Sequence, residues 1–336
     1  MPRRAFAIAA AVTLGLGAAW TAMADAPASP GDELRGAVKV DGSSTVYPFA
    51  EAVAEEFSKK HPDVKVTVGQ SGTGGGFKRF GAGEIDFANA SRPITKSEAA
   101  ACEAKSIAFV EIPVAFDGLS IVVNRGNDWV KQLTVEQITR LFSADGKIST
   151  WKDLDPSWPA ETIKLYAPGT DSGTFDYFRE VTVGKSGKIR SDMSVSETDN
   201  VLVRGVEGDR NAIGFFGYAY LVANEKRLRA VPVVNPKTGT AVMPSPASIE
   251  DGTYAPFGRP LFVYATVAAL GRPAGLAYAE FMLEHAGELA QEVGYVKLPD
   301  AVYERARANL KARRTGTQWL DAEGKDRHGP ISDLYR

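Results

Sequence analysis

Residues 38–57 read VKVDGSSTVYPFAEAVAEEF, and this stretch predicts the architecture of the whole chain. Its first two valines flank a lysine, which is the alternation of a short strand. After a break at Asp41-Gly42, the apolar side chains of Phe49, Val53 and Phe57 recur on one helical face. A proline suits the first turn of this helix because its ring fixes φ near the helical value. The stretch therefore predicts a strand, a polar turn and an amphipathic helix.

The same alternation of strand and helix continues along the chain. Further strands are expected at residues 64–68, 85–90, 107–112, 119–123, 163–167, 212–216 and 261–267. Further helices are expected around residues 77–80, 135–141, 175–178, 274–284 and 288–293. The spacing Thr134-x-x-Gln137 matches a capping box at the start of one of them. This alternation predicts an α/β architecture with largely parallel sheets, and about 300 residues of it suggest two lobes.

Three strand-to-helix turns, at residues 41–45, 71–76 and 169–174, share one chemistry. Each presents the unpaired N–H groups of a helix N-terminus together with hydroxyls and glycines, a combination that binds anions. In an open α/β sheet such turns lie at the carboxyl ends of strands, where ligands bind. A single turn of this kind is ordinary helix capping, a role open to Ser44 or Thr45 in the first. Three in one chain favour a shared site for a small oxyanion.

The Gly-rich turn does not match the common nucleotide loops. In the pattern G-x-x-x-x-G-K-[ST] the lysine position is occupied by Gly75, and in G-x-G-x-x-G the last glycine is replaced by Phe77. Nucleotide binding is therefore unsupported, whereas a small oxyanion held by neutral donors fits the residues. A fourth segment, Ser91-Arg92, ends another expected strand with a hydroxyl and a guanidinium.

The composition excludes several further classes of function. The chain has 336 residues with 39 Lys and Arg against 41 Asp and Glu, and this balance disfavours nucleic acid as a partner. One cysteine excludes a disulfide framework or a Cys-rich metal or iron–sulfur site, and three scattered histidines do not form a metal cluster. We therefore expect no cofactor and no metal.

The first residues have the features of a secretion signal. Arg3 and Arg4 precede an uncharged, mostly apolar run to Trp20, and Ala22-Met23-Ala24 follows with small residues at the cleavage positions. The run is shorter than the roughly 20 apolar residues of a membrane span. We expect residues 1–24 to be removed after about Ala24, residues 25–36 to be a flexible leader, and the mature protein to be periplasmic.

Several segments together resemble the phosphate-binding protein of the high-affinity phosphate ABC transporter, in particular the branch that carries GTDSGTFDYF. They are residues 41–49, 71–76, 85–94, 169–178, 212–218 and 259–264. The resemblance covers about residues 37–300 and implies a two-lobed periplasmic binding protein fold of type II. Each lobe is then a mixed sheet flanked by helices, with the ligand in the cleft. Residues 37–116 and 260–336 would form lobe I, and residues 117–259 lobe II.

The resemblance also implies a set of phosphate-binding residues. Carried over by position, and extended to the adjoining polar residues, the set is Ser44, Thr45, Val46, Ser71, Gly72, Thr73, Ser91, Arg92, Asp171, Ser172, Gly173 and Thr174. Two positions depart from the better-studied members, which place an aspartate where Ser91 stands and an arginine where Pro168 stands. We suggest that Arg92 and Asp171 supply the missing charge pair. The acceptor matters because sulfate carries no proton, and an unpaired buried acceptor costs about 1–3 kcal/mol, or more when charged.

The function implied by the resemblance is capture of inorganic phosphate by lobe closure and its delivery to the permease subunits of an ABC transporter. We expect a monomer that is not an enzyme. The alternatives are a binding protein for another tetrahedral oxyanion, such as sulfate or molybdate, and an exported phosphate sensor or adhesin. A hydrolase with Ser172 as nucleophile is disfavoured, because no histidine lies near an expected strand end and Thr170 replaces the first glycine of G-x-S-x-G. The charged stretch 305–336 is expected to be a solvated face.

Overall fold

The computed structural model describes residues 34–170, 172–184, 186–196, 198–327 and 329–336. Its main sheet has the strand order β2-β1-β3-β12-β4-β8-β6-β7, with β9 also paired to β4. These strands are β1 (Gly36–Gly42), β2 (Val64–Val68), β3 (Phe87–Ala90), β4 (Phe109–Asn124), β6 (Lys164–Pro168), β7 (Ser194–Ser196), β8 (Ala212–Gly217), β9 (Leu228–Ala230) and β12 (Gly258–Thr266). A small sheet joins β5 (Leu133–Thr134), β10 (Val233–Val234) and β11 (Ala241–Val242).

The main sheet is mixed and consists of two halves that share β4. In the first half-sheet, β1 pairs in parallel with β2 and β3, while β12 runs antiparallel between β3 and β4. In the second half-sheet, β6 pairs in parallel with β7 and β8, and β8 runs antiparallel to β4. The strand β4 changes partner from β12 to β8 between Gly118 and Leu119. The α/β fold with mixed sheets that the resemblance implied is confirmed, whereas the prediction of largely parallel sheets is wrong, because β12 and β4 run antiparallel to their neighbours.

Two expected strands at residues 107–112 and 119–123 are one strand, because β4 continues for 16 residues. The residues between the two expected strands, 113–118, remain extended, and at their end Asp117 and Gly118 lie opposite Arg259 and Gly258 of β12. Every residue of β4 except its last is buried, which is the pattern of a strand covered on both faces.

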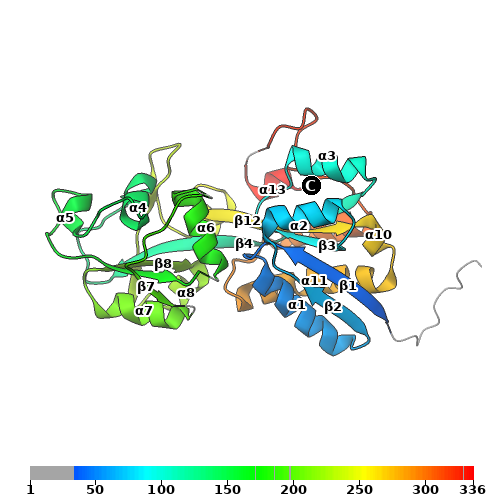
Figure 1. Ribbon diagram of the computed structural model, residues 1–336, viewed down its shortest axis with the longest axis horizontal. Coiled ribbons are helices and arrows are strands. Elements are labelled where there is room, and N and C mark those ends of the chain that lie inside the picture. The colour runs from blue at the N-terminus through cyan, green and yellow to red at the C-terminus, as the bar shows by residue number, and fades with distance from the viewer. Residues whose placement is uncertain (1–33, 171, 185, 197, 328) are drawn as a thin grey trace, which may run out of the picture. The chain divides into compact units, whose positions relative to one another are not determined.

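Helices cover both faces of the main sheet. Figure 1 shows α2 and α3 on one side of strands β1 and β3, and α1 and α11 on the other. The helices are α1 (Tyr47–Lys60), α2 (Gly72–Gly81), α3 (Lys96–Ala104), α4 (Val135–Phe142), α5 (Trp151–Leu154), α6 (Gly173–Thr182), α7 (Asp199–Gly208), α8 (Tyr218–Ala223), α9 (Pro246–Glu250), α10 (Val267–Leu270), α11 (Pro273–Glu292), α12 (Asp300–Lys311) and α13 (Ile331–Leu334). The two helices expected at 274–284 and 288–293 form the single helix α11. Its interior Gly287 is accommodated because the neighbouring Ala286 and Leu289 are buried in the core.

The first helix confirms its predicted core face and corrects its predicted cap. Phe49, Val53 and Phe57 are fully buried. The N-cap residue is Val46, and no side chain caps the helix, so the prediction that Ser44 or Thr45 caps it is wrong. Those two hydroxyls bond to other partners, described below. The capping box predicted at Thr134 and Gln137 is confirmed at α4.

The C-terminal segment, residues 313–336, combines buried aromatic and aliphatic side chains with exposed charged ones, so the expected solvated face is only part of its structure. Trp319, Ile331 and Tyr335 are buried. The Arg305 guanidinium on α12 donates to the carbonyl oxygens of Ser332 and Tyr335, at 2.6 and 2.8 Å. Arg305 therefore helps to hold the segment in place, whereas Arg307 and Lys311 of the same helix are exposed, as the sequence predicted.

Residues 1–33, which include the expected signal peptide and most of the leader, lie outside the described residues. Within the part that the structure describes, no helix combines the length and the apolar character needed to cross a bilayer.

Two glycines of α2 provide a matched test of the packing of this helix against β1. A methyl group at Gly76 would lie 2.6 Å from the Cα atom of Gly42, whereas a methyl group at Gly74 would meet nothing within 4 Å. We expect Gly76→Ala to lower the free energy of unfolding by about 1–3 kcal/mol, because backbone must move on one side. Gly74→Ala should leave it unchanged or raise it by up to about 1 kcal/mol. Urea unfolding of both variants measures the difference, and equal effects would contradict this packing.

Candidate functional site

Two helix N-termini open onto one cavity of about 510 Å³, the main cavity. Its lining comes from the turn after β1 (43–45), the start of α2 (72–74), the segment after β3 (91–93), the helix α6, and the residues around Arg259. Neither α1 nor α2 has a side chain that caps its first turn. The first-turn N–H groups of a helix have no intrahelical partners and carry partial positive charge. The main cavity is therefore suited to an anion.

Four hydroxyls lie at the same cavity. The backbone N–H of Ser91 donates to Thr73 Oγ1 at 3.2 Å, and the hydroxyl oxygens of these two residues are 3.1 Å apart. Ser44 Oγ donates to Asp176 Oδ2 at 3.3 Å. The Thr45 hydroxyl lies 3.5 Å from the carbonyl oxygen of Gly173. These groups add neutral hydrogen-bond donors to the helix amides without adding charge.

The guanidinium of Arg259 forms the cationic part of the cavity wall. Its Nη2 donates to Thr45 Oγ1 at 2.9 Å, and Nε and Nη2 both lie 3.4 Å from Asp117 Oδ2. The guanidinium also stands 3.6 Å from the centre of the Tyr177 ring, a close cation–π contact. Glu180 lies 3.8 Å away on the side of Nη1. The side chain of Arg259 is 13% exposed, so its charge is held in one place beside the cavity.

The carboxylate of Asp117 is fully inside the protein, directly opposite Arg259 on the neighbouring strand. Burial raises the pKa of Asp117, and the charge and hydrogen bonds of Arg259 oppose that rise. Sequence reasoning did not include Arg259 in the site, although the segment 259–264 contributed to the resemblance. An arginine just before an apolar strand that was expected to be buried is the signal that could have pointed to it.

Arg92 lines the main cavity and forms an ion pair with a carboxylate of α3. Its guanidinium forms two hydrogen bonds to Glu98, both 2.8 Å long. Burial acts to raise the pKa of Glu98, but hydrogen bonds from Arg92 and Thr95 outweigh it and the pKa is lowered. Asp171, the suggested partner of Arg92, lies outside the described residues. The structure therefore pairs Arg92 with the helix-capping carboxylate of α3.

The third polar turn meets the first turn, and its described residues 172–174 are not part of the lining of the main cavity. Ser172 Oγ accepts the N–H of Thr174 and so caps its own helix. A methyl group at Gly173 would lie 2.5 Å from the Cα atom of Thr45, so only glycine allows this approach. The part of α6 that reaches the cavity carries Asp176 and Tyr177 instead.

Other members of the predicted site are placed as follows. Thr45, Ser44, Gly72, Thr73, Ser91 and Arg92 line the main cavity. Val46 is fully buried at the start of α1, and Ser71 is exposed, with its N–H donating to Asp41 Oδ1 at 3.0 Å. Sequence reasoning missed Asp176, Arg179 and Glu180 of α6, which line the cavity one helical turn beyond the predicted residues.

The described residues offer little support for metal or nucleophilic chemistry at this cavity. Within residues 34–336, apart from the undescribed positions, no three His, Cys, Asp or Glu side chains gather as metal ligands would. The ring of His61 packs at a tilt against Phe57, and that of His285 packs at a tilt against Phe281. Neither histidine lines the main cavity. His328 lies outside the described residues.

Comparison with known proteins places the chain in a family. The model of the PBP superfamily domain matches residues 27–285. Protein SphX of Synechococcus elongatus is 47% identical over 305 residues, which cover 90% of this chain and 89% of SphX. The phosphate-binding protein PstS of Staphylococcus saprophyticus is 40% identical over 276 residues, which cover 82% of this chain and 84% of PstS.

One solved structure is similar to this chain over most of the length of both proteins. It is described as a possible phosphate binding protein from Planctomyces limnophilus, with a TM-score of 0.81 and 47% identity over 84% of this chain and 99% of the other. The chain therefore belongs to the PBP superfamily and has its mixed α/β periplasmic binding protein fold. Within that superfamily its relatives include SphX and PstS.

Removal of Arg259 tests the buried charge pair. We expect Arg259→Ala to lower the free energy of unfolding by about 3–5 kcal/mol near pH 8, because the Asp117 carboxylate is left buried without its partner. The variant loses the one group that lowers the pKa of Asp117, so the folded pKa rises further above the unfolded value of about 3.9. In the variant, the contribution of Asp117 to the free energy of unfolding is therefore fully present below pH 3.9 and is lost as pH rises through the folded pKa.

Urea unfolding of Arg259→Ala at pH 5 and pH 8 measures this dependence. The double variant Arg259→Ala/Asp117→Asn should recover much of the loss at pH 8. The exposed pair of Arg179 and Asp176 is a control, since Arg179→Ala should change stability little. A loss that is equal at both pH values and not rescued by Asp117→Asn would contradict this account.

Proposed function

We propose that this protein binds inorganic phosphate in the main cavity and delivers it to the permease of an ABC transporter. The observation that carries the proposal is the convergence of two uncapped helix N-termini, hydroxyls from three segments, and the largely buried guanidinium of Arg259 on a single cavity. A tetrahedral oxyanion presents acceptors in several directions, and this arrangement supplies donors from several directions. The names of PstS and of the Planctomyces limnophilus protein, both related to this chain, support phosphate as the ligand.

The chain is proposed to bind its ligand between two lobes that move relative to each other. We place the boundary where β4 leaves β12 for β8, close to the expected boundaries at residues 116–117 and 259–260. The contacts of Ser44 with Asp176 and of Thr45 with Gly173 join the turn after β1 to α6. A ligand that bridges these two elements would favour the closed arrangement by its additional contacts, which is a population shift.

Export to the periplasm, removal of residues 1–24 and a monomeric state complete the proposal.

The phosphate-contacting set is proposed to be Ser44, Thr45, Thr73, Ser91 and Arg259, with the amides at the starts of α1 and α2. Arg259 is largely neutralised by Asp117, so most of the proposed donors to the anion are neutral. Binding by neutral donors needs no surplus of positive charge, in agreement with the near balance of charges in the chain.

Calorimetric titration with phosphate, sulfate and molybdate tests the proposed ligand. We expect heat of binding with phosphate and none with the other two ions. Thr73→Val should weaken phosphate binding about tenfold or more, since hydrogen bonds to charged groups contribute more than neutral ones. Thr240→Val, at an exposed threonine outside the main cavity, is the matched control. Silence with all three ions, or tighter binding of sulfate or molybdate, would refute phosphate as the ligand.

The carboxylate of Asp176 is proposed to accept the proton of hydrogen phosphate. It lies at the main cavity, 3.3 Å from the hydroxyl oxygen of Ser44 at the entrance to α1. A carboxylate there repels sulfate, which has no proton to donate. We expect Asp176→Asn to weaken phosphate binding and strengthen sulfate binding, so that the ratio of their dissociation constants falls at least tenfold. Competition titrations measure the ratio, with Glu180→Gln as the comparison, and an unchanged ratio in Asp176→Asn would assign the proton to another acceptor.

A further inference from the structure

A buried carboxylate connects the C-terminal segment to the centre of the first half-sheet. Glu111 of β4 is 3% exposed. Its carboxylate accepts hydrogen bonds from Thr317 Oγ1 at 2.5 Å, from the Gln318 N–H at 2.9 Å and from Tyr264 Oη at 2.9 Å. Two of these donors belong to the C-terminal segment, and the third belongs to β12. All three are neutral, so no counter-charge compensates the buried carboxylate through these bonds.

Two of the donors are held in the donating orientation by a second bond. Tyr264 Oη accepts the N–H of Ile94 at 2.9 Å, and Thr317 Oγ1 accepts the N–H of Trp319 at 3.1 Å. The hydrogen of each hydroxyl is therefore free to point at Glu111. A continuous path of hydrogen bonds leads from the C-terminal segment through Glu111 and Tyr264 to the backbone of Ile94.

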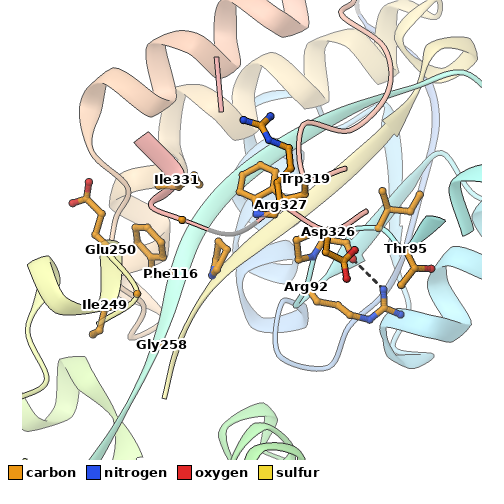
Figure 2. A pocket seen from close by; sticks show the side chains of 15 residues that line it. Arg92, Thr95, Phe116, Ile249, Glu250, Gly258, Trp319, Asp326, Arg327 and Ile331 are labelled. Atoms are coloured by element: carbon orange, nitrogen blue, oxygen red, sulfur yellow. Dashed lines mark hydrogen bonds between the residues drawn. The ribbon is translucent and has the colours of Figure 1, made fainter. Parts of the chain in front are cut away.

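Ile94 follows directly on the segment 91–93 of the main cavity. The Arg92 guanidinium stands over the Phe77 ring, which in turn meets the Tyr264 ring at 5.0 Å between centroids. Figure 2 shows Arg92 with Trp319 and Arg327 of the C-terminal segment around a neighbouring cavity of about 320 Å³. Arg92 is thus shared between the proposed phosphate site and the surface that the C-terminal segment forms.

We propose that Glu111 is a positioning residue for the main cavity: it couples the docking of the C-terminal segment to the placement of residues 91–94 through Tyr264. The effect on phosphate rests on the proposed function, whereas the coupling itself does not. When Glu111 is ionised, all three donors are satisfied. When it is protonated, its oxygens accept hydrogen bonds less strongly, so the Tyr264 hydroxyl is less polarised and accepts the Ile94 N–H more weakly.

This coupling gives the site a pH dependence near neutrality. Burial raises the pKa of Glu111 to about 7, although three hydrogen bonds act in the opposite direction. The other titratable groups that face it are phenols, Tyr264 from β12 and Tyr335 from the C-terminal segment, and burial raises the pKa of both. The hydroxyl of Tyr303 on α12 donates to the carbonyl oxygen of Val114, which belongs to β4 as Glu111 does. Burial raises the pKa of Tyr303 to about 12. The charges beyond these rings belong to Arg92, near Tyr264, and to Arg314, near Tyr335.

Ionisation of Glu111 has opposite effects on the stability of the fold and on the connection to Ile94. The folded pKa of Glu111 lies above the unfolded value of about 4.3, so its contribution to stability is fully present below pH 4.3 and is lost as pH rises through about 7. The connection to Ile94, by contrast, is complete above pH 7 and weakened below it. A change that merely loosened the fold would shift both in the same direction.

Amide hydrogen exchange of the ligand-free protein, followed by NMR between pH 6 and pH 8, tests the coupling. After correction for intrinsic exchange, the protection of the Ile94 amide should fall about threefold or more from pH 8 to pH 6 in the wild type. In Glu111→Gln it should be low and independent of pH. Tyr335→Phe is the control, because it removes the bond from the C-terminal segment to the Glu111 carbonyl and leaves the carboxylate untouched. It should retain the pH dependence.

Phosphate titrations complete the test. Glu111→Gln should weaken phosphate binding about threefold to tenfold at pH 8 and less at pH 6, and the ratio to wild type cancels the titration of phosphate itself. Protection of Ile94 that is constant with pH in the wild type overturns the coupling, even if Glu111→Gln does not fold. If the wild type binds no phosphate, the proposed function fails, and the Ile94 amide still decides the role of Glu111.

Discussion

The cross-strand pair of Arg259 and Asp117 is the contact on which the site depends. The two residues lie opposite each other on β12 and β4, one step before β4 leaves the first half-sheet for the second. A buried carboxylate at that point requires a cation, and the cation that satisfies it also reaches the Thr45 hydroxyl and the Tyr177 ring. One guanidinium thus connects the strand shared by both half-sheets with the turn after β1 and with α6.

The remaining chemistry of the main cavity comes from backbone and hydroxyl groups. At α1 and α2 no side chain caps the first turn, whereas α6 is capped by its own Ser172. The difference separates two roles for similar sequences: the uncapped start of α2 lines the cavity, and the capped turn of α6 packs against Thr45 through Gly173. At α1 the Tyr47 N–H donates to the Ser43 carbonyl oxygen at 3.0 Å and Pro48 has no N–H, so the cavity is lined there by residues 43–45. Residue type alone does not distinguish these roles, because serine serves equally as a cap and as a ligand donor.

The sequence predicted the elements well where the pattern was local. The face of α1, the capping box at Thr134 and the strand-to-helix turns all follow from spacing within a few residues. It failed where long-range pairing decides the outcome. Gly118 does not break β4 because Gly258 lies opposite it, and Gly287 does not break α11 because its neighbours are buried. Arg259 was missed because its partner Asp117 stands 142 residues away in the chain.

The place of β12 in the sheet has a consequence for the order in which the protein can acquire its fold. This strand lies between β3 and β4, yet it begins at Gly258, after every other strand of the sheet has been synthesised. A nascent chain that lacks it cannot join β3 to β4, and the partners of Glu111 at 317 and 318 emerge later still. Such distant pairings make folding slow, so the complete sheet can form only once the residues beyond Gly258 are available to pair with β3 and β4.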